Sequence, residues 1–254
     1  MSGKKRNPFD DGFDRDAAWR YQRLRPAYPT EVTETIASFL PNGARIADLG
    51  AGTGQLSLPL LQAGFQVVAV EPSKGMRDVL SGAPWAEHPD LRVLAASAEE
   101  TGLLDNSAEA LTWADSFHWL DKERATLEAQ RILKPGGIAF LVANQLNVSK
   151  PWVHRLSRIM RSGDVLREVP GDLLGPFFSL SSKHAWSWEH QLAVEDLLEL
   201  AKTRSSYLRS SPEVARRMQD NLRWYLIDHL GFRPGEQVLL PYRTLLWAFR
   251  KTLK

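Results

Sequence analysis

The chain has no cysteine and no long hydrophobic run. Because none of its 254 residues is a cysteine, neither a disulfide framework nor thiolate chemistry is available to it. No uninterrupted apolar run approaches the ~20 residues that span a bilayer, and the first residues show no apolar signal core. We therefore expect a soluble, cytoplasmic protein without a membrane partner.

An excess of charge of one sign is missing as well. Lys and Arg total 32 against 30 Asp and Glu, a formal net charge of +2. So balanced a charge does not suggest a polyanionic partner, and we expect no nucleic acid. The basic cluster Lys4, Lys5 and Arg6 lies in a polar N-terminus that we expect to be disordered.

Glycine is concentrated in one short segment after a predicted strand. Gly50, Gly52 and Gly54 alternate there, and the next apolar run ends at Glu71. A turn without Cβ atoms lets the backbone approach a ligand closely, and the following helix directs its N–H groups at that ligand. A carboxylate at the end of the second strand can accept hydrogen bonds from both ribose hydroxyls. The pattern predicts a nucleoside-cofactor site.

The spacing of these glycines argues against two common phosphate-binding loops. A dinucleotide-binding turn follows G-x-G-x-x-G, whereas here Gln55 directly follows Gly54. The Lys-Ser/Thr pair that a P-loop requires is also missing. Neither phosphate nor pyrophosphate is therefore the expected ligand of this turn.

Residues 48–54 closely resemble the first motif of class I S-adenosylmethionine (SAM)-dependent methyltransferases. Three later segments match further motifs of this family in the same order, at 68–76, 97–99 and 131–137. Two others, 25–29 and 113–119, resemble the small-molecule branch (methyltransferase type 11) that includes trans-aconitate methyltransferases. The likeness is good from about Phe13 to about Val142 and loose elsewhere.

The resemblance implies an α/β, Rossmann-like fold: a mostly parallel seven-stranded sheet with helices on both faces and a largely helical cap. The sequence rhythm agrees with this fold, because short apolar runs alternate with helical stretches. The expected strands lie near 44–49, 66–70, 91–95, 109–114 and 137–143, with a sixth within 183–192 and a final antiparallel one over 237–250. Helical periodicity in the second half lies near 152–160, 194–201 and 212–230.

We expect three structural parts along the chain. They are a disordered tail with an N-terminal lid helix (1–34), a SAM-binding core (35–145 and 236–254), and a substrate-binding cap (146–235). The cap is assigned because the strand–helix rhythm breaks down there.

The same resemblance implies which residues hold SAM and its product, S-adenosylhomocysteine. Glu71 would hold the ribose, and Met76 would pack on the adenine. The full expected set is Tyr21, Arg25, Asp48, Gly50, Ala51, Gly52, Thr53, Gly54, Glu71, Pro72, Met76, Ser97, Ala98, Glu99, Asp115 and Phe117. Tyr21 and Arg25 lie four residues apart on one face of a short helix, which either folds over the cofactor or simply packs on the core.

Asp115 has two interpretations. Methylases of protein amides and nucleic-acid bases carry two prolines directly after this acid, whereas Asp115 is followed by Ser116 and Phe117. An amide or base nitrogen is therefore not the expected acceptor. Asp115 then contributes to the cofactor site, or it is a solvated acid in a turn.

The acceptor side offers fewer signals. His118 follows the fourth strand and is the candidate catalytic residue, either as a general base or as a group that shapes the pocket. Trp119, Arg204 and Tyr207 are the candidate substrate-binding residues. Arg204 could grip a carboxylate bidentately, or it could be an ordinary surface arginine. The histidines show no metal-ligand spacing, and we expect no metal.

These features predict a SAM-dependent methyltransferase with a small-molecule acceptor. A carboxylate oxygen is favoured, because a carboxylate is already ionised at neutral pH and needs no base. The alternatives are a hydroxyl, nitrogen or carbon methyltransferase of natural-product biosynthesis, and a SAM-binding protein without transfer activity. The sequence leaves the oligomeric state open.

Overall fold

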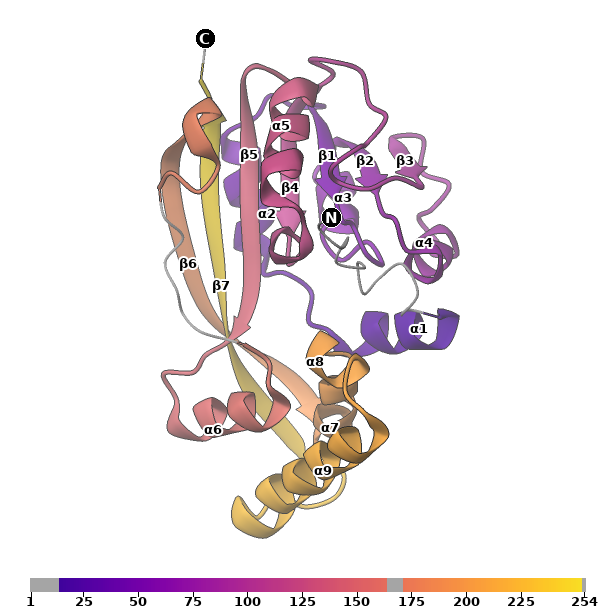
Figure 1. The fold of residues 1–254 in the computed structure, drawn as a ribbon, viewed down its shortest axis with the longest axis vertical. Helices are drawn as coiled ribbons and strands as arrows, with labels where there is room; N and C mark the ends of the chain where they lie inside the picture. The colour runs from indigo at the N-terminus through magenta and orange to yellow at the C-terminus, as the bar shows by residue number, and fades with distance from the viewer. Residues whose placement is uncertain (1–13, 164–170, 253–254) are drawn as a thin grey trace, which may run out of the picture.

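The computed structural model describes residues 14–163 and 171–252. Most of the expected N-terminal tail therefore lies outside the described residues. Within them, seven strands form one sheet in the order β3-β2-β1-β4-β5-β7-β6 (Figure 1). The strands are β1 Arg45–Leu49, β2 Gln66–Val70, β3 Leu91–Leu94, β4 Ala108–Ala114, β5 Leu133–Leu146, β6 Phe178–Ala193 and β7 Gln237–Lys251.

The directions of the strands confirm the expected fold class. β1 to β5 pair in parallel, and β7 runs antiparallel between β5 and β6. The sixth strand lies where it was expected but is longer, because it pairs with β7 from Phe178 to Ala193. β5 also begins earlier than expected, at Leu133. Between the pairs Ala108–Leu133 and Ala110–Ile138, residues 134–137 bulge out of the ladder, so the expected turn lies inside the strand.

The helices begin and end at recognisable signals. They are α1 Arg15–Leu24, α2 Thr30–Ser38, α3 Ser57–Gln62, α4 Lys74–Ser81, α5 Lys122–Ile132, α6 Pro151–Met160, α7 Val194–Lys202, α8 Ser205–Leu208 and α9 Pro212–Arg223, with the short 3-10 helices η1 Phe117–Trp119 and η2 Gly175–Phe177 and the π-helix η3 Trp224–His229. Asp14 and Ser211 accept hydrogen bonds as N-caps of α1 and α9. Pro26 keeps Arg25 extended, and α1 ends there. Within the described residues, no helix has the length and apolar character needed to cross a membrane.

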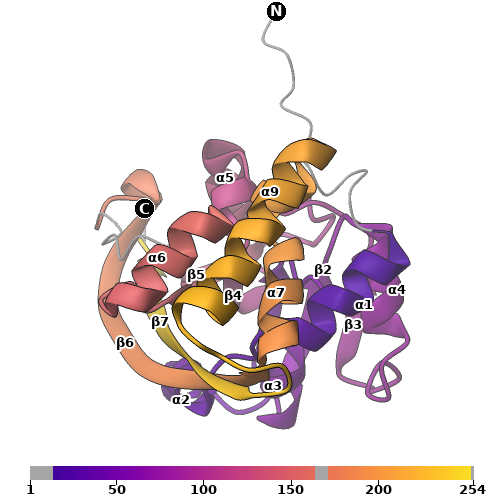
Figure 2. The same ribbon diagram turned by 90° about the horizontal axis from the view of Figure 1, so that it is seen from below.

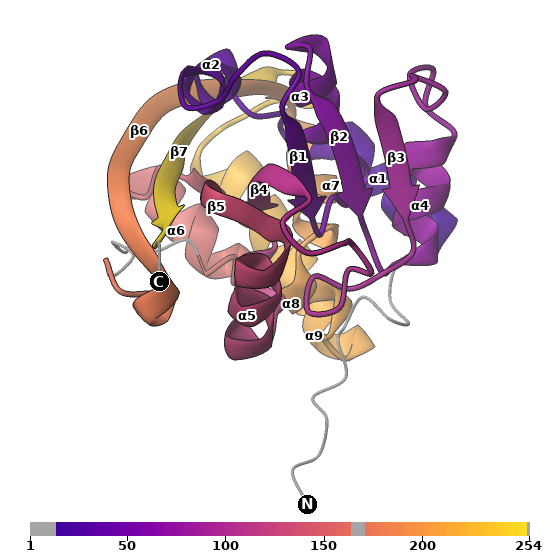
Figure 3. The same cartoon turned by 90° about the horizontal axis from the view of Figure 1, so that it is seen from above.

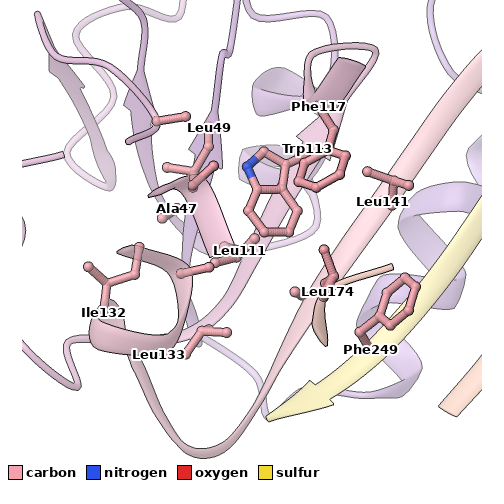
Figure 4. Close-up of a cluster of buried hydrophobic side chains, with 14 of the residues drawn as sticks. Ala47, Leu49, Leu111, Trp113, Phe117, Ile132, Leu133, Leu141, Leu174 and Phe249 are labelled. Carbon is pink, nitrogen blue, oxygen red and sulfur yellow. The ribbon is translucent and has the colours of Figure 1, made fainter. Parts of the chain in front are cut away.

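Helices cover both faces of the sheet. α2 and α3 lie on one face and α5 on the other (Figure 3). On the α5 face, Leu111 and Trp113 of β4 pack with Leu49, Phe117 and Leu141 (Figure 4). The central strands are buried on both faces, as expected for parallel strands between helical layers.

A second hydrophobic core lies beyond the end of the parallel strands. The β4–β5 pairing stops at Ala114–Val142, whereas the three long strands continue together to the pairs Leu146–Tyr242 and Ala193–Gln237. α6, α7 and α9 pack on this extension (Figure 2). The range 146–235 expected for the cap therefore includes β6, a strand of the sheet, and the division into domains stays a prediction.

Candidate functional site

A cavity of about 590 Å³ lies at the carboxyl ends of β1, β2 and β4. This is the edge where open α/β sheets bind ligands, and the volume is within the roughly 300–1,000 Å³ of small-molecule sites. α1 and α8 face this edge of the sheet (Figure 1). The chain thus brings its N-terminal helix, the sheet and the second core together around one cavity.

Most of the predicted site residues line this cavity. They are Tyr21, Arg25, Gly50, Gly52, Glu71, Pro72, Met76, Ala98, Glu99, Asp115, His118, Trp119 and Arg204. The predicted residues that do not line it are Asp48, Ala51, Thr53, Gly54, Ser97, Phe117 and Tyr207. Residues that sequence reasoning missed also contribute, among them Ser116, Asn144, Gln145, Arg161, Thr203, Ser205, Ser206 and Arg209.

The glycine turn forms one wall of the cavity. Gly50 and Gly52 have φ of +76° and +59°, which glycine adopts at no steric cost. A Cβ at Gly50 would lie 2.6 Å from Cβ of Ser116, whereas a Cβ at Gly52 would meet no protein atom within 4 Å. The turn at Gly52 therefore leaves room for ligand atoms. Gly54 has a different role, because its Cβ would lie 2.4 Å from the ring of Trp85.

Glu71 is held at the end of β2 by backbone hydrogen bonds. Its Oε2 accepts from the N–H of Gly52 and its Oε1 from the N–H of Ser73, both at 2.8 Å. Burial raises the pKa of Glu71, and these two bonds counteract the increase. A carboxylate offers about four acceptor sites, so two remain for the hydroxyls of a ribose.

Asp48 and Phe117 support the cavity from behind. The Asp48 carboxylate is 1% exposed and accepts from the hydroxyls of Ser57 at 2.6 Å and Thr112 at 2.7 Å. It therefore ties β1 to β4 and to the start of α3. Phe117 is buried against Trp113, with 4.8 Å between ring centroids (Figure 4).

Asp115 lies at the end of β4 with a left-handed backbone, φ +51°. Its carboxylate accepts from the N–H of Asn144 at 3.1 Å and from the hydroxyl of Tyr28 at 3.0 Å. Burial raises its pKa to about 6, although Arg25, these bonds and Arg204 oppose the increase. Asp115 is thus a partly buried, hydrogen-bonded group and not a solvated turn acid.

Asn144 was missed, although the sequence carries a signal for it. It is the first polar residue after the apolar part of β5, and it lies at the carboxyl edge of the sheet. Tyr28 lies in the segment 25–29, which resembles a motif of the family, but its partner Asp115 is 87 residues away in the sequence. No local pattern indicates such a contact.

Three guanidinium groups gather on the side of the cavity formed by α1, α8 and η1. Arg25 donates from Nε to the hydroxyl of Thr203 at 3.0 Å and lies 5.1 Å from the ring centroid of Tyr21. Arg204 is buried, so it is not an ordinary surface arginine. Arg209 lies 4.9 Å from the ring centroid of Trp119. This side of the cavity therefore carries three cations, and the carboxylate of Asp115 interacts electrostatically with two of them, Arg25 and Arg204. Tyr207 instead packs against the second core.

His118 lines the cavity, and its residue is exposed. Desolvation by the surrounding protein lowers its pKa to about 4, with further contributions from the cations Arg25, Lys122 and Arg209. The imidazole is therefore neutral near pH 7 and a weak base.

Comparison with known proteins identifies the family to which this chain is similar. A family model described as a methyltransferase domain matches residues 47–141. An uncharacterized methyltransferase of Mycobacterium tuberculosis is 37% identical over 231 residues, which cover 90% of this chain and 91% of that protein. Among solved structures, the YcgJ protein of Bacillus subtilis has a TM-score of 0.54 at 19% identity, covering 87% of this chain and 97% of that one. A phosphoethanolamine N-methyltransferase of Haemonchus contortus, solved with phosphomonomethylethanolamine and S-adenosylhomocysteine, has a TM-score of 0.57 at 13% identity, covering 97% and 59%.

Proposed function

The chain belongs to the class I SAM-dependent methyltransferases, and from this we infer that it methylates a small-molecule acceptor, with a carboxylate oxygen favoured. SAM is the cofactor of this family, and when bound it supplies a methyl group activated on a sulfonium. The proposal concerns the acceptor, which the family itself leaves open.

The cofactor half of the cavity suits this group. Gly52 leaves space where a side chain would obstruct a ligand, and Glu71 has acceptor capacity for ribose hydroxyls. Met76 and Ala98 offer apolar surface for the adenine, with the carboxylate of Glu99 beside them in the same lining. We assign these residues, with Gly50 and Pro72, to cofactor binding.

One observation supports a carboxylate acceptor above the others, and it is the presence of guanidinium groups in the cavity lining. Arg204 and Arg209 line the cavity together with the acids Glu71, Glu99 and Asp115. Guanidinium groups match the planar geometry of a carboxylate and can bind it with two parallel hydrogen bonds. Arg25, which also lines the cavity, would offer a cation to the methionine carboxylate of the cofactor.

The neutral His118 supports the same acceptor. A hydroxyl acceptor needs a base near its own site, and a histidine with a pKa of about 4 is poorly matched to that task near pH 7. A carboxylate needs no base, so transfer depends on aligning the acceptor and excluding water. His118 then shapes the pocket beside Trp119, whose ring centroid lies 4.8 Å from its own.

The test is methyl transfer from labelled SAM to a panel of carboxylic acids and their matched alcohols, phenols and amines. We expect label in esters only. Arg204→Gln should raise the KM for the acid strongly, while Arg216→Gln, which changes an exposed arginine on α9, should leave it unchanged. His118→Ala should lower kcat only modestly, because a carboxylate acceptor needs no general base, whose removal would cost about 10²–10⁴-fold. Label in the alcohols together with a loss of that size in His118→Ala would refute the carboxylate acceptor.

A further inference from the structure

Residues 25–29, which join α1 to α2, are tied to three separate parts of the protein. Arg25 donates to Thr203 in the turn after α7. The carbonyl of Ala27 accepts from the side-chain amide of Asn144 at 3.3 Å. The hydroxyl of Tyr28 donates to Asp115 at 3.0 Å. The segment is therefore fixed to the second core, to β5 and to the loop after β4.

The bond from Tyr28 ends on a carboxylate that also holds the sheet edge. β4 pairs with β5 as far as Ala114 and Val142. One residue later the carboxylate of Asp115 accepts from the N–H of Asn144, and so continues the connection between the two strands with a side chain. Asp115 is thus a fixed partner and not a mobile surface acid.

Buried hydrogen bonds hold Asn144, which donates to Asp115, in place. The amide oxygen of Asn144 accepts from the hydroxyl of Thr244, which is fully buried. Thr244 in turn accepts from the indole N–H of Trp188 at 2.8 Å. These bonds connect the cavity wall on β5 through β7 to β6. A buried network whose members are paired in this way is rigid.

We propose that Tyr28 is a positioning residue: its hydrogen bond to Asp115 latches residues 25–29, and α1 with them, over the cofactor half of the cavity. Tyr28 does not itself line the cavity, so it acts through Asp115 and through the placement of Tyr21 and Arg25, which do. Opening this latch frees the cofactor's path to solvent. The inference concerns retention of the cofactor and does not depend on the identity of the acceptor.

The test compares the rates at which S-adenosylhomocysteine leaves wild type and Tyr28→Phe, measured by stopped-flow displacement. Phenylalanine keeps the ring and removes only the hydroxyl. Losing a hydrogen bond to a charged group costs enough free energy that S-adenosylhomocysteine should leave about tenfold faster or more. Tyr225→Phe is the matched control, because the hydroxyl of Tyr225 is also hydrogen-bonded, to the carbonyl of Trp152 at 3.0 Å, but within the second core. The control should release the ligand at the wild-type rate.

A double-mutant cycle separates a latch from a general loss of stability. If Tyr28 acts through Asp115, the effects of Tyr28→Phe and Asp115→Asn on the release rate should not be additive. Tryptic cleavage after Arg20 and Arg23 in the presence of saturating S-adenosylhomocysteine should also be faster in Tyr28→Phe. Unchanged release in Tyr28→Phe, an equal acceleration in Tyr225→Phe, or strict additivity in the cycle would each overturn the proposal.

Discussion

Glu71 shows how one side chain can order a turn and still offer a binding site. Its two oxygens hold the N–H groups of Gly52 and Ser73, so the carboxylate is fixed before any ligand arrives. A preordered acceptor loses little entropy on binding, which increases affinity.

We predict that Glu71→Ala weakens binding of S-adenosylhomocysteine by about 1–3 kcal/mol, because hydrogen bonds to a charged group are lost. Isothermal titration calorimetry measures the change. Glu100→Ala, which removes an exposed acid outside the cavity lining, should bind as wild type. Equal affinities for wild type and Glu71→Ala would show that the carboxylate does not hold the ribose.

Asp115 predicts a pH dependence with a definite sign. Its pKa is raised from 3.8 to about 6, so ionisation costs more in the folded than in the unfolded protein. The contribution of Asp115 to stability is fully present below pH 3.8 and is lost as the pH rises through about 6. Asp115→Asn does not titrate, so the Tm of this variant minus that of wild type should increase between pH 4 and pH 7. A difference that stays constant over this range would contradict the raised pKa.

At the scale of secondary-structure elements, the strands differ in length, and the short and the long strands support different parts of the cavity. β1 and β2 end at the glycine turn and Glu71, whereas β5, β6 and β7 continue past that edge and carry α6, α7 and α9. The helices that bring Thr203 and Arg204 to the cavity therefore rest on their own core. Damage to that core should affect stability before it affects the cofactor wall.

We predict that Leu222→Ala in α9 lowers the free energy of unfolding by about 2–5 kcal/mol, the usual result of a cavity in a packed core. Leu222 is fully buried there. Urea denaturation measures the loss, and Leu208→Ala, at a leucine that is 38% exposed, is the control. Calorimetric binding of S-adenosylhomocysteine to folded Leu222→Ala should remain close to wild type. A loss of binding at unchanged stability would show that the second core and the cofactor wall are not separate.

At the scale of the whole molecule, α1 links the second core to α4. Leu24 packs in the second core, while Ala18 packs on Met76 and Val79 of α4, beside the cofactor half. A ligand enclosed by α1, the sheet and α8 would therefore contact both the sheet and elements that pack on the second core.

Such a ligand should stabilise the protein as a unit. Binding to the folded state alone adds about 2.7 kcal/mol at a ligand concentration 100 times the Kd. We therefore predict a single thermal transition whose Tm rises with S-adenosylhomocysteine and is unaffected by NAD. Differential scanning calorimetry makes the comparison. Stabilisation by NAD, without an effect of S-adenosylhomocysteine, would contradict the assigned cofactor site.

The sequence by itself determined the parallel half of the sheet and the glycine turn, and its resemblance to class I SAM-dependent methyltransferases indicated the cofactor. The strands and the turn are local features: each strand, turn and acid lies within a few tens of residues of the next, and the alternation of apolar runs predicts them. The positions of Gly50, Gly52 and Glu71 at the sheet edge therefore follow from the sequence alone.

Only the tertiary structure decided what surrounds that turn. The contact of Arg25 with Thr203 joins residues 178 apart, and that of Tyr28 with Asp115 joins residues 87 apart. Hydrophobic periodicity cannot predict such pairs. It indicates which face of a helix or strand is buried, but not which other element packs on that face. The same limit applies to Gly54, whose pattern matched a ligand-binding turn but whose backbone instead makes room for Trp85.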